Sequence, residues 1–137
     1  MHQPGDLAEL LDRRATELVA MKAVMDAERT LGRDPRDVSA QNVGCDVVSV
    51  DPGSHAELYL EVKGRRQGAT TVMVTRNEIL RALNVPERYV LALVEVANDQ
   101  AVSIGYVRSP FTREPESFTE SVVCDLRDLM GRALAPS

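Results

Sequence analysis

Cysteine and histidine are scarce in this sequence of 137 residues, which contains two of each. Cys45 and Cys124 are far apart in the chain and lack the spacing of zinc ligands. We therefore expect two reduced thiols, as in a cytoplasmic protein, instead of a structural zinc site or a disulfide. His55 lies in a predicted turn with no second histidine at ligand spacing, so we do not propose it as a metal ligand.

Long apolar runs are also missing, and this argues against association with a membrane. No segment approaches the roughly 20 consecutive apolar residues that a helix needs to cross a bilayer. The first ten residues, MHQPGDLAEL, have neither the basic region nor the apolar core of a secretory signal. The sequence has no internal repeat, no low-complexity tract and no linker, and its length suits one domain.

What the sequence does contain is an ordinary apolar share and an uneven distribution of charge. Hydrophobic residues make up 44% and charged residues of both signs 27%, which indicates a folded core and not a disordered chain. The net charge of −5 argues mildly against a large surface for nucleic acid. From Val62 to Tyr89, however, six basic residues stand against two acidic ones. Arg65, Arg66 and Arg76 belong to this positive stretch.

Hydrophobic periodicity predicts an α/β domain with the order helix, three strands, helix and two or three further strands. The first helix is expected at 6–31, with an inward stripe formed by Leu7, Leu11, Leu18, Met21 and Met25. Gly32 is placed to end this helix. A second helix is expected to begin at Thr75, with Glu78 completing a capping box. Asp125 could cap a short helix to about residue 134. The predicted strands are 45–51, 56–64, 69–75, 88–97, 101–109 and 121–126.

Two connections carry turn signals. The segment 33–44 is rich in Pro, Asp, Ser, Asn and Gly, so we predict a loop there. Within it, Asp37, Ser39 and Asn42 are first of all turn formers, through bonds from side chain to backbone. The order Pro-Gly in the connection 52–55 predicts a type II turn.

The stretch LYLEVKGRRQG (58–68) ends a strand with an acid, a base and two arginines. Strand alternation turns Val62 towards the core and places Glu61 and Lys63 on the other face. If the strands on either side of the predicted turn form an antiparallel hairpin closed by four residues, Asp46 lies opposite Glu61. Two facing carboxylates repel each other, and a divalent cation between them would turn repulsion into coordination. The alternative is a solvated strand end with a weak ion pair.

Glu28 is a further acid in an unfavourable position. It follows Met25 by three residues on the inward stripe of the first helix. It also lies in the last turn before Gly32, where the helix dipole disfavours a negative charge. Either Glu28 pairs with a nearby arginine, or it points at the same site as Asp46 and Glu61.

A helical Glu, then an Asp, then Glu-x-Lys on an αβββαβ order resembles the PD-(D/E)XK nuclease superfamily. More specifically, residues 25–97 resemble the domain named after the C-terminal part of the plant protein NO VEIN, through the pattern DVS…N.G.D…EVKG…T.NE. Such domains are found at the end of bacterial Swi/Snf-type helicases and of defence-associated proteins. The tail YVRSPFTREP looks like the end of the helicase-linked copies. Cys45 departs from the family, which usually has an aromatic residue before the Asp.

The resemblance implies a fold and a set of site residues. The fold would be restriction endonuclease-like, an α+β arrangement with a mixed central sheet flanked by helices. It would form one nuclease-like domain over residues 1–137, either a whole protein or the C-terminal piece of a larger one. Asp46, Glu61 and the carbonyl of Val62 would hold Mg²⁺ or Mn²⁺. Lys63 would stabilise charge on the phosphate, and Glu28 would support the metal site.

The resemblance also implies an activity and partners. The expected reaction is metal-dependent hydrolysis of a DNA phosphodiester, in bacterial defence or DNA processing. Arg65, Arg66 and Arg76 would contact backbone phosphates. A helicase domain or partner subunit is expected, and a second copy would be needed to cut both strands. Two alternatives stay open: a catalytically weak or inactive DNA-binding module attached to a helicase, and a structural domain in which the acids are coincidental.

Overall fold

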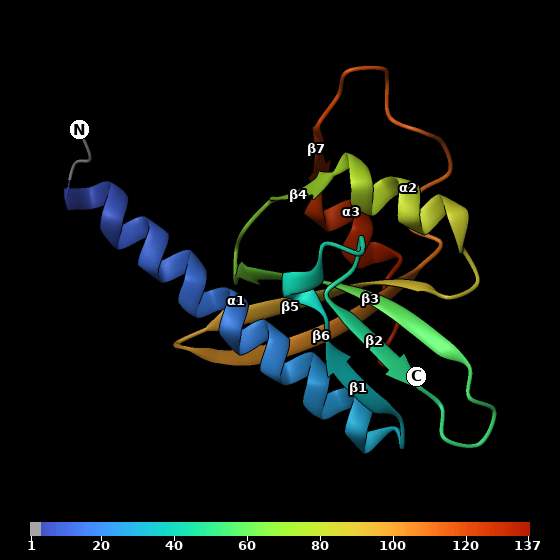
Figure 1. The fold of residues 1–137 in the computed structure, drawn as a ribbon. Coiled ribbons are helices and arrows are strands. Elements are labelled where there is room, and N and C mark those ends of the chain that lie inside the picture. Colours follow the sequence, from blue (N-terminus) through green and yellow to red (C-terminus); the bar gives the residue numbers. More distant parts are fainter. Residues whose placement is uncertain (1–3) are drawn as a thin grey trace.

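Five strands form a mixed sheet in the computed structural model, which describes residues 4–137 (Figure 1). Their order across the sheet is β1 (Asp34–Asp37), β2 (Val47–Val50), β3 (Glu57–Arg66), β5 (Tyr89–Ala97) and β6 (Gln100–Arg108). Strands β3 and β5 run parallel, while the other neighbours are antiparallel. The parallel pair requires a long crossover connection, which the chain makes through the next strand and helix.

A two-stranded ribbon stands apart from this sheet. It pairs β4 (Thr71–Thr75) with β7 (Ser121–Asp125) and is accompanied by α2 (Arg76–Asn84) and α3 (Leu126–Gly131). The predicted third strand therefore exists as β4, but its partner is the last strand of the chain. Local sequence gives no signal for such a pairing, because the two strands are far apart along the chain.

The central strand β5 is buried on both faces, as its continuous apolar run predicts. Val90, Ala92 and Val94 face the long helix α1 (Pro4–Thr30), with which they form one core cluster. Leu91 and Leu93 face the opposite way and pack with residues of β4 and α3 in a second cluster. The predicted mixed α+β architecture, with helices on both sides of a mixed sheet, is confirmed.

Helix α1 contacts the sheet through small residues. Thr16, Ala20 and Val24 are buried along one side of the helix. A Cβ atom on Gly64 of β3 would lie 2.7 Å from the Cβ of Ala20 and 3.0 Å from the carbonyl oxygen of Thr16. The helix and the strand approach each other so closely that a side chain at position 64 has no room.

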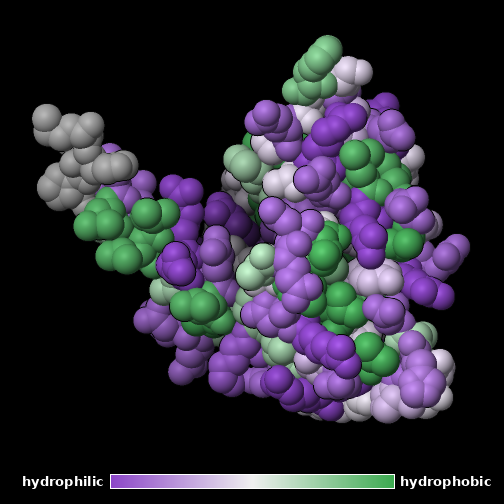
Figure 2. Space-filling view, in the orientation of Figure 1, coloured by the Kyte–Doolittle hydropathy of each residue, from purple (hydrophilic) through white to green (hydrophobic). Residues whose placement is uncertain are grey.

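The predicted inward stripe of α1 is confirmed for Met21 and Met25, which pack against the core, and is wrong for its three leucines. The side chains of Leu7, Leu11 and Leu18 are 56%, 59% and 66% exposed. The N-terminal half of the helix extends past the edge of the sheet (Figure 1), and hydrophobic residues gather on this projecting part (Figure 2). At Gly64 the helix packs against the sheet through Thr16 and Ala20 and not through the leucines, because only small side chains allow the close approach.

The predicted helix ends are confirmed by their hydrogen bonds. The Thr75 hydroxyl accepts from the Glu78 N–H at 3.2 Å, and the Glu78 carboxylate accepts from the Thr75 N–H at 2.8 Å, which completes the capping box. The Asp125 carboxylate caps α3, although that helix ends at Gly131 and not near residue 134. Gly32 follows α1 with a φ of 83°, the left-handed conformation expected there.

Two loop predictions need correction. The segment predicted to be a loop contains β1, whose sequence DPRD has low strand propensity and pairs with β2 all the same. The connection after β2 is not a type II turn, because Gly53 lacks the positive φ that this turn requires, and His55 has it instead. The Asp51 carboxylate organises the turn by accepting from the N–H groups of Gly53 and Ser54.

Both cysteines are free thiols. Burial raises the pKa of Cys45 to about 11, so this thiol is unreactive at neutral pH. None of the helices in residues 4–137 combines the length and the apolar character that spanning a bilayer demands.

Candidate active site

The β2–β3 hairpin has the register that the sequence predicts. The N–H of Asp51 donates to the carbonyl of Ala56 at 2.9 Å, and Val47 lies opposite Leu60. Continuing this register by one residue brings Asp46 beside Glu61. The two carboxylates therefore meet at the end of the hairpin, where β3 runs on beyond β2.

Asp46 and Glu61 form a carboxylate pair that is partly withdrawn from water. The N–H of Val62 donates to Oδ2 of Asp46 at 2.9 Å and holds this carboxylate against β3. Glu61 is 5% exposed. Burial, together with the adjacent Asp46 and Glu78 carboxylates, raises the pKa of Glu61 to about 11. At neutral pH this shift favours the protonated form of Glu61 when no metal ion is bound.

Lys63 lies between two carboxylates from different elements. Its Nζ is 2.9 Å from Oε1 of Glu78 on α2 and 3.7 Å from Oε1 of Glu61. Burial opposes ionisation of Glu78, but the hydrogen bond from Glu61 and the charge of Lys63 lower its pKa overall. Glu78, predicted only as a helix cap, is thus also the nearest ionic partner of Lys63, and sequence analysis missed this second role.

The side chains of Asp46, Glu61 and Lys63 line a cleft of about 600 Å³. Helix α1, the short helix η1 (Ser39–Gln41), the β2–β3 hairpin and the end of β4 all contribute to it. Its polar lining includes Glu17, Ser39, Asp46, Glu61, Lys63 and Thr75. The Asp37 carboxylate accepts hydrogen bonds from the N–H and the hydroxyl of Ser39. These bonds confirm the turn-forming role predicted for the two residues.

Of the four predicted catalytic residues, the structure brings Asp46, Glu61 and Lys63 together and leaves Glu28 apart. Glu28 is fully buried between α1 and the sheet and does not line the cleft. Its carboxylate accepts from Arg33 Nε at 2.6 Å, from Arg33 Nη2 at 2.9 Å and from the Tyr106 hydroxyl at 2.7 Å. Although burial opposes it, these hydrogen bonds lower the pKa of Glu28. The pairing with a nearby arginine is therefore the alternative that the geometry favours.

Glu17 is the acid of α1 that the cleft contains. It lies about three helical turns before Glu28, towards the projecting half of the helix. Sequence analysis missed this residue because the stripe was assigned from apolar residues alone; two of these, Leu18 and Met21, line the cleft beside Glu17. Because Ala20 packs against Gly64, the side of α1 that carries Glu17 borders the cleft.

Two of the predicted phosphate contacts lie beside the cleft. Arg65 donates from Nε to the carbonyl of Thr71 at 2.9 Å, and Arg66 pairs with the carboxylate of Asp12. Both line a hollow of about 170 Å³ that shares Gly64 with the cleft. Both arginines therefore lie next to the cleft, and each is held there by a contact within the protein.

Arg76 is further removed, because its Nη1 donates to the carbonyl of Glu116 at 3.0 Å and it does not line the cleft. The cleft holds a different arginine, Arg14 of α1. Arg14 and Lys63 are the two basic residues of the cleft lining. Sequence analysis missed Arg14, since nothing local indicates which side of α1 borders the site.

The donor set suits a hard divalent cation. Within residues 4–137, no three acidic, histidine or cysteine side chains are grouped as a complete metal cage. Asp46 and Glu61 supply two carboxylates, and Val62, whose N–H donates to Asp46, lines the same cleft. Mg²⁺ commonly takes one or two carboxylates and keeps several waters, and Mn²⁺ accepts the same ligands. The neighbouring carboxylates raise the pKa of Glu61, and a bound cation would take the place of its proton. The residues present therefore fit the metal.

Comparison with known proteins gives two findings. The family model described as "Protein NO VEIN, C-terminal" matches residues 16–107. Among solved structures, the chain is similar to Hjc, a Holliday junction resolvase from the archaeal hyperthermophile Archaeoglobus fulgidus, with a TM-score of 0.59 and 12% identity over 87% of this chain and 90% of that one. None of the curated proteins matches the chain. At this low identity the structural likeness shows the fold, which is restriction endonuclease-like.

Proposed function

The chain belongs to the family of NO VEIN C-terminal domains, and from this premise we propose that it hydrolyses phosphodiester bonds in DNA with the help of a divalent cation. The fold is that of nuclease-like domains. One observation carries the proposal: Asp46 converges in a single cleft with Glu61 and Lys63 of β3, although β2 and a turn separate it from that strand. A carboxylate pair can hold a cation that polarises a phosphate and activates water, and an ammonium group beside it can stabilise charge on the phosphate oxygens.

Each residue of the cleft has a role that its contacts support. Asp46 and Glu61, with the Val62 carbonyl, would hold the cation. When bound, the cation polarises the phosphate and makes a water molecule more acidic. Lys63 directs its ammonium group into the same space and would stabilise the charge that develops on the phosphate oxygens. Its hydrogen bond to Glu78 fixes the direction of the flexible lysine side chain.

The surroundings of the cleft suit a polyanionic strand. Arg14 lines the cleft itself, and Arg65 and Arg66 line the adjoining hollow. The chain as a whole carries a net charge of −5, and these arginines are the side chains beside the cleft that could contact backbone phosphates. Contacts of this kind position the backbone, are weakened by salt and do not read sequence.

The setting of this activity is also part of the proposal. A cytoplasmic location, a role in bacterial defence or DNA processing, and a helicase domain or subunit as partner agree with the family resemblance. One cleft can cut one strand, so a break in both strands needs a second copy or a second binding event. DNA is the substrate we expect because the fold is shared with a junction resolvase.

The test is cleavage of plasmid and linear DNA with Mn²⁺ or Mg²⁺ by the protein and by three variants, Asp46→Ala, Glu61→Ala and Lys63→Ala. We expect each variant to lose at least about a hundredfold in rate, since each removes a group aimed at the reacting phosphate or its cation. Glu57→Ala is the matched control, because Glu57 is an exposed acid on the same strand, opposite Val50. Its rate should equal that of the unmodified protein.

Calorimetry with Mn²⁺ separates the remaining possibilities. Binding that Asp46→Ala abolishes, together with cleavage, supports the nuclease. Binding of Mn²⁺ without cleavage supports the catalytically inactive DNA-binding module. The absence of binding would leave a structural domain, and cleavage that survives all three substitutions would identify a contaminant.

A further inference from the structure

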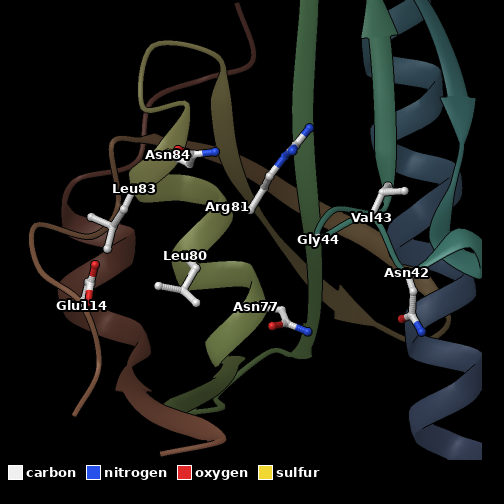
Figure 3. A pocket seen from close by; sticks show the side chains of 9 residues that line it. All are labelled: Asn42, Val43, Gly44, Asn77, Leu80, Arg81, Leu83, Asn84 and Glu114. Atoms are coloured by element: carbon white, nitrogen blue, oxygen red, sulfur yellow. The ribbon is translucent and has the colours of Figure 1, made fainter. Parts of the chain in front are cut away.

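A second concave surface adjoins the cleft on the far side of the segment 38–46. It is an open groove of about 550 Å³ between the loop 42–44 and the exposed side of α2. Figure 3 shows Asn77, Arg81 and Asn84 extending from one side of α2 towards β3 and the 42–44 loop. Leu80 lies on the other side of the helix in this view. We call this surface the amide groove.

The amide groove and the cleft are built from the same two segments. In the segment before β2, Ser39 and Asp46 line the cleft, and residues 42–44 line the groove. The start of α2 places Thr75 at the cleft and Asn77 at the groove. A DNA strand with its phosphate in the cleft would therefore bring a neighbouring nucleotide to the groove.

The polar groups of the groove suit a neutral ligand better than a phosphate. Asn42, Asn77 and Asn84 are exposed, and their side-chain amides make no hydrogen bond with the rest of residues 4–137. Each amide offers a donor and an acceptor, the combination that base edges present. The charges of Arg81 and Glu114 balance, so the groove has none of the positive excess that a phosphate site shows.

The floor of the groove is closely packed. The guanidinium of Arg81 lies over the Tyr59 ring, with its Cζ 4.6 Å from the ring centroid. Gly44 has a φ of 85°, and a Cβ there would lie 3.1 Å from the Cβ of Arg81, so a glycine is needed for the loop to approach α2. The buried Nε of Arg81 has no hydrogen-bond partner within residues 4–137. The packed floor leaves the exposed amides of the rim as the polar groups that a ligand in the groove can reach.

We propose that the amide groove binds a nucleobase that flanks the scissile phosphate and reads its edge through Asn77 and Asn84. The apolar side chains of Leu80 and Leu83 at the rim can contact the plane of the base or its sugar. This inference rests on the proposed nuclease function for the position of the phosphate. It adds a source of sequence preference, which the arginines beside the cleft do not provide.

The experiment is cleavage of DNA oligonucleotides with a randomised centre in Mn²⁺, followed by sequencing of the ends. The unmodified protein should favour one base at a fixed position next to the cut by at least about fivefold, the lower limit for one bidentate pair of an amide with a base. Asn77→Ala and Asn84→Ala should reduce this preference towards an equal use of the four bases. Gln100→Ala removes an exposed amide far from the groove in sequence and is the matched control.

A cleavage pattern without base preference, or a preference that persists in both asparagine variants, would overturn the inference. If the protein cuts nothing, the nuclease proposal fails, and the groove is then tested by binding alone. In that arm, oligonucleotides bound in the presence of Ca²⁺ are recovered from the random pool and sequenced. Base enrichment that Asn77→Ala removes supports the groove, and enrichment that is absent or unchanged refutes it.

Discussion

Replacing Gly64 by alanine tests whether the contact between α1 and β3 determines the shape of the cleft. The new methyl group would lie 2.7 Å from the Cβ of Ala20 and 3.0 Å from the carbonyl oxygen of Thr16. Carbon atoms in contact normally stay about 3.5–4.0 Å apart, so the helix must move by about 1 Å. Helix α1 carries Arg14 and Glu17 into the cleft, and a shift of the helix would displace both.

The expected loss of stability follows from two opposing effects. Overpacking of this kind costs about 1–3 kcal/mol. Gly64 does not have a positive φ, so its backbone conformation is open to alanine. An alanine there lowers the conformational entropy of the unfolded chain, which stabilises the folded state by about 0.4–1 kcal/mol. The net change in the free energy of unfolding should be a loss of about 1–2 kcal/mol. For a domain of this size, that lowers the melting temperature by roughly 3–10 °C.

Thermal and urea denaturation measure this effect against two references. Gly131→Ala is the matched control, because a Cβ at Gly131 meets nothing within 4 Å. Combining Gly64→Ala with Ala20→Gly removes the closest contact, so the double variant should be more stable than the sum of the two single effects. Equal melting temperatures for Gly64→Ala and Gly131→Ala, or strict additivity in the double variant, would refute the close packing described above.

Two further predictions concern Glu28 and Thr75. Glu28→Gln should cost about 3 kcal/mol at neutral pH, because Arg33 loses the carboxylate with which it is paired. The pKa of Glu28 is lowered in the folded state, so its contribution is complete above the ordinary carboxyl pKa and is lost as the pH falls through the folded-state value. The difference in the free energy of unfolding in urea between the unmodified protein and Glu28→Gln should therefore shrink as the pH is lowered. A loss of cleavage without a loss of stability would instead make Glu28 a site residue. Thr75→Ala should cost about 1 kcal/mol through loss of the helix cap, while Thr75→Ser should keep most of it, and equal losses in the two would contradict the capping role.

The part of the site that could be predicted from the sequence depends on short-range geometry. A turn of four residues sets the register of the hairpin, and this register is enough to place Asp46 beside Glu61. Strand alternation puts Lys63 on the same face as Glu61. Glu28 is buried, as its place on the predicted inward stripe indicates, but it lies about three helical turns from Glu17 and pairs with Arg33. Glu17 was missed because the stripe was assigned from apolar residues alone. Exposed leucines on the projecting half of the helix mimic the pattern of a buried face.

The sequence by itself determined the features that depend on residues close together in the chain: the helix caps, the central apolar strand and the hairpin with its two carboxylates. Their physical causes act over a few residues, through backbone hydrogen bonds and through the periods of helices and strands. Only the tertiary structure decided that Glu17 and not Glu28 borders the cleft, that Glu78 holds Lys63, and that β4 pairs with β7. These outcomes follow from packing between distant segments, above all from the absence of a side chain at Gly64, which sets the side of α1 that meets the sheet.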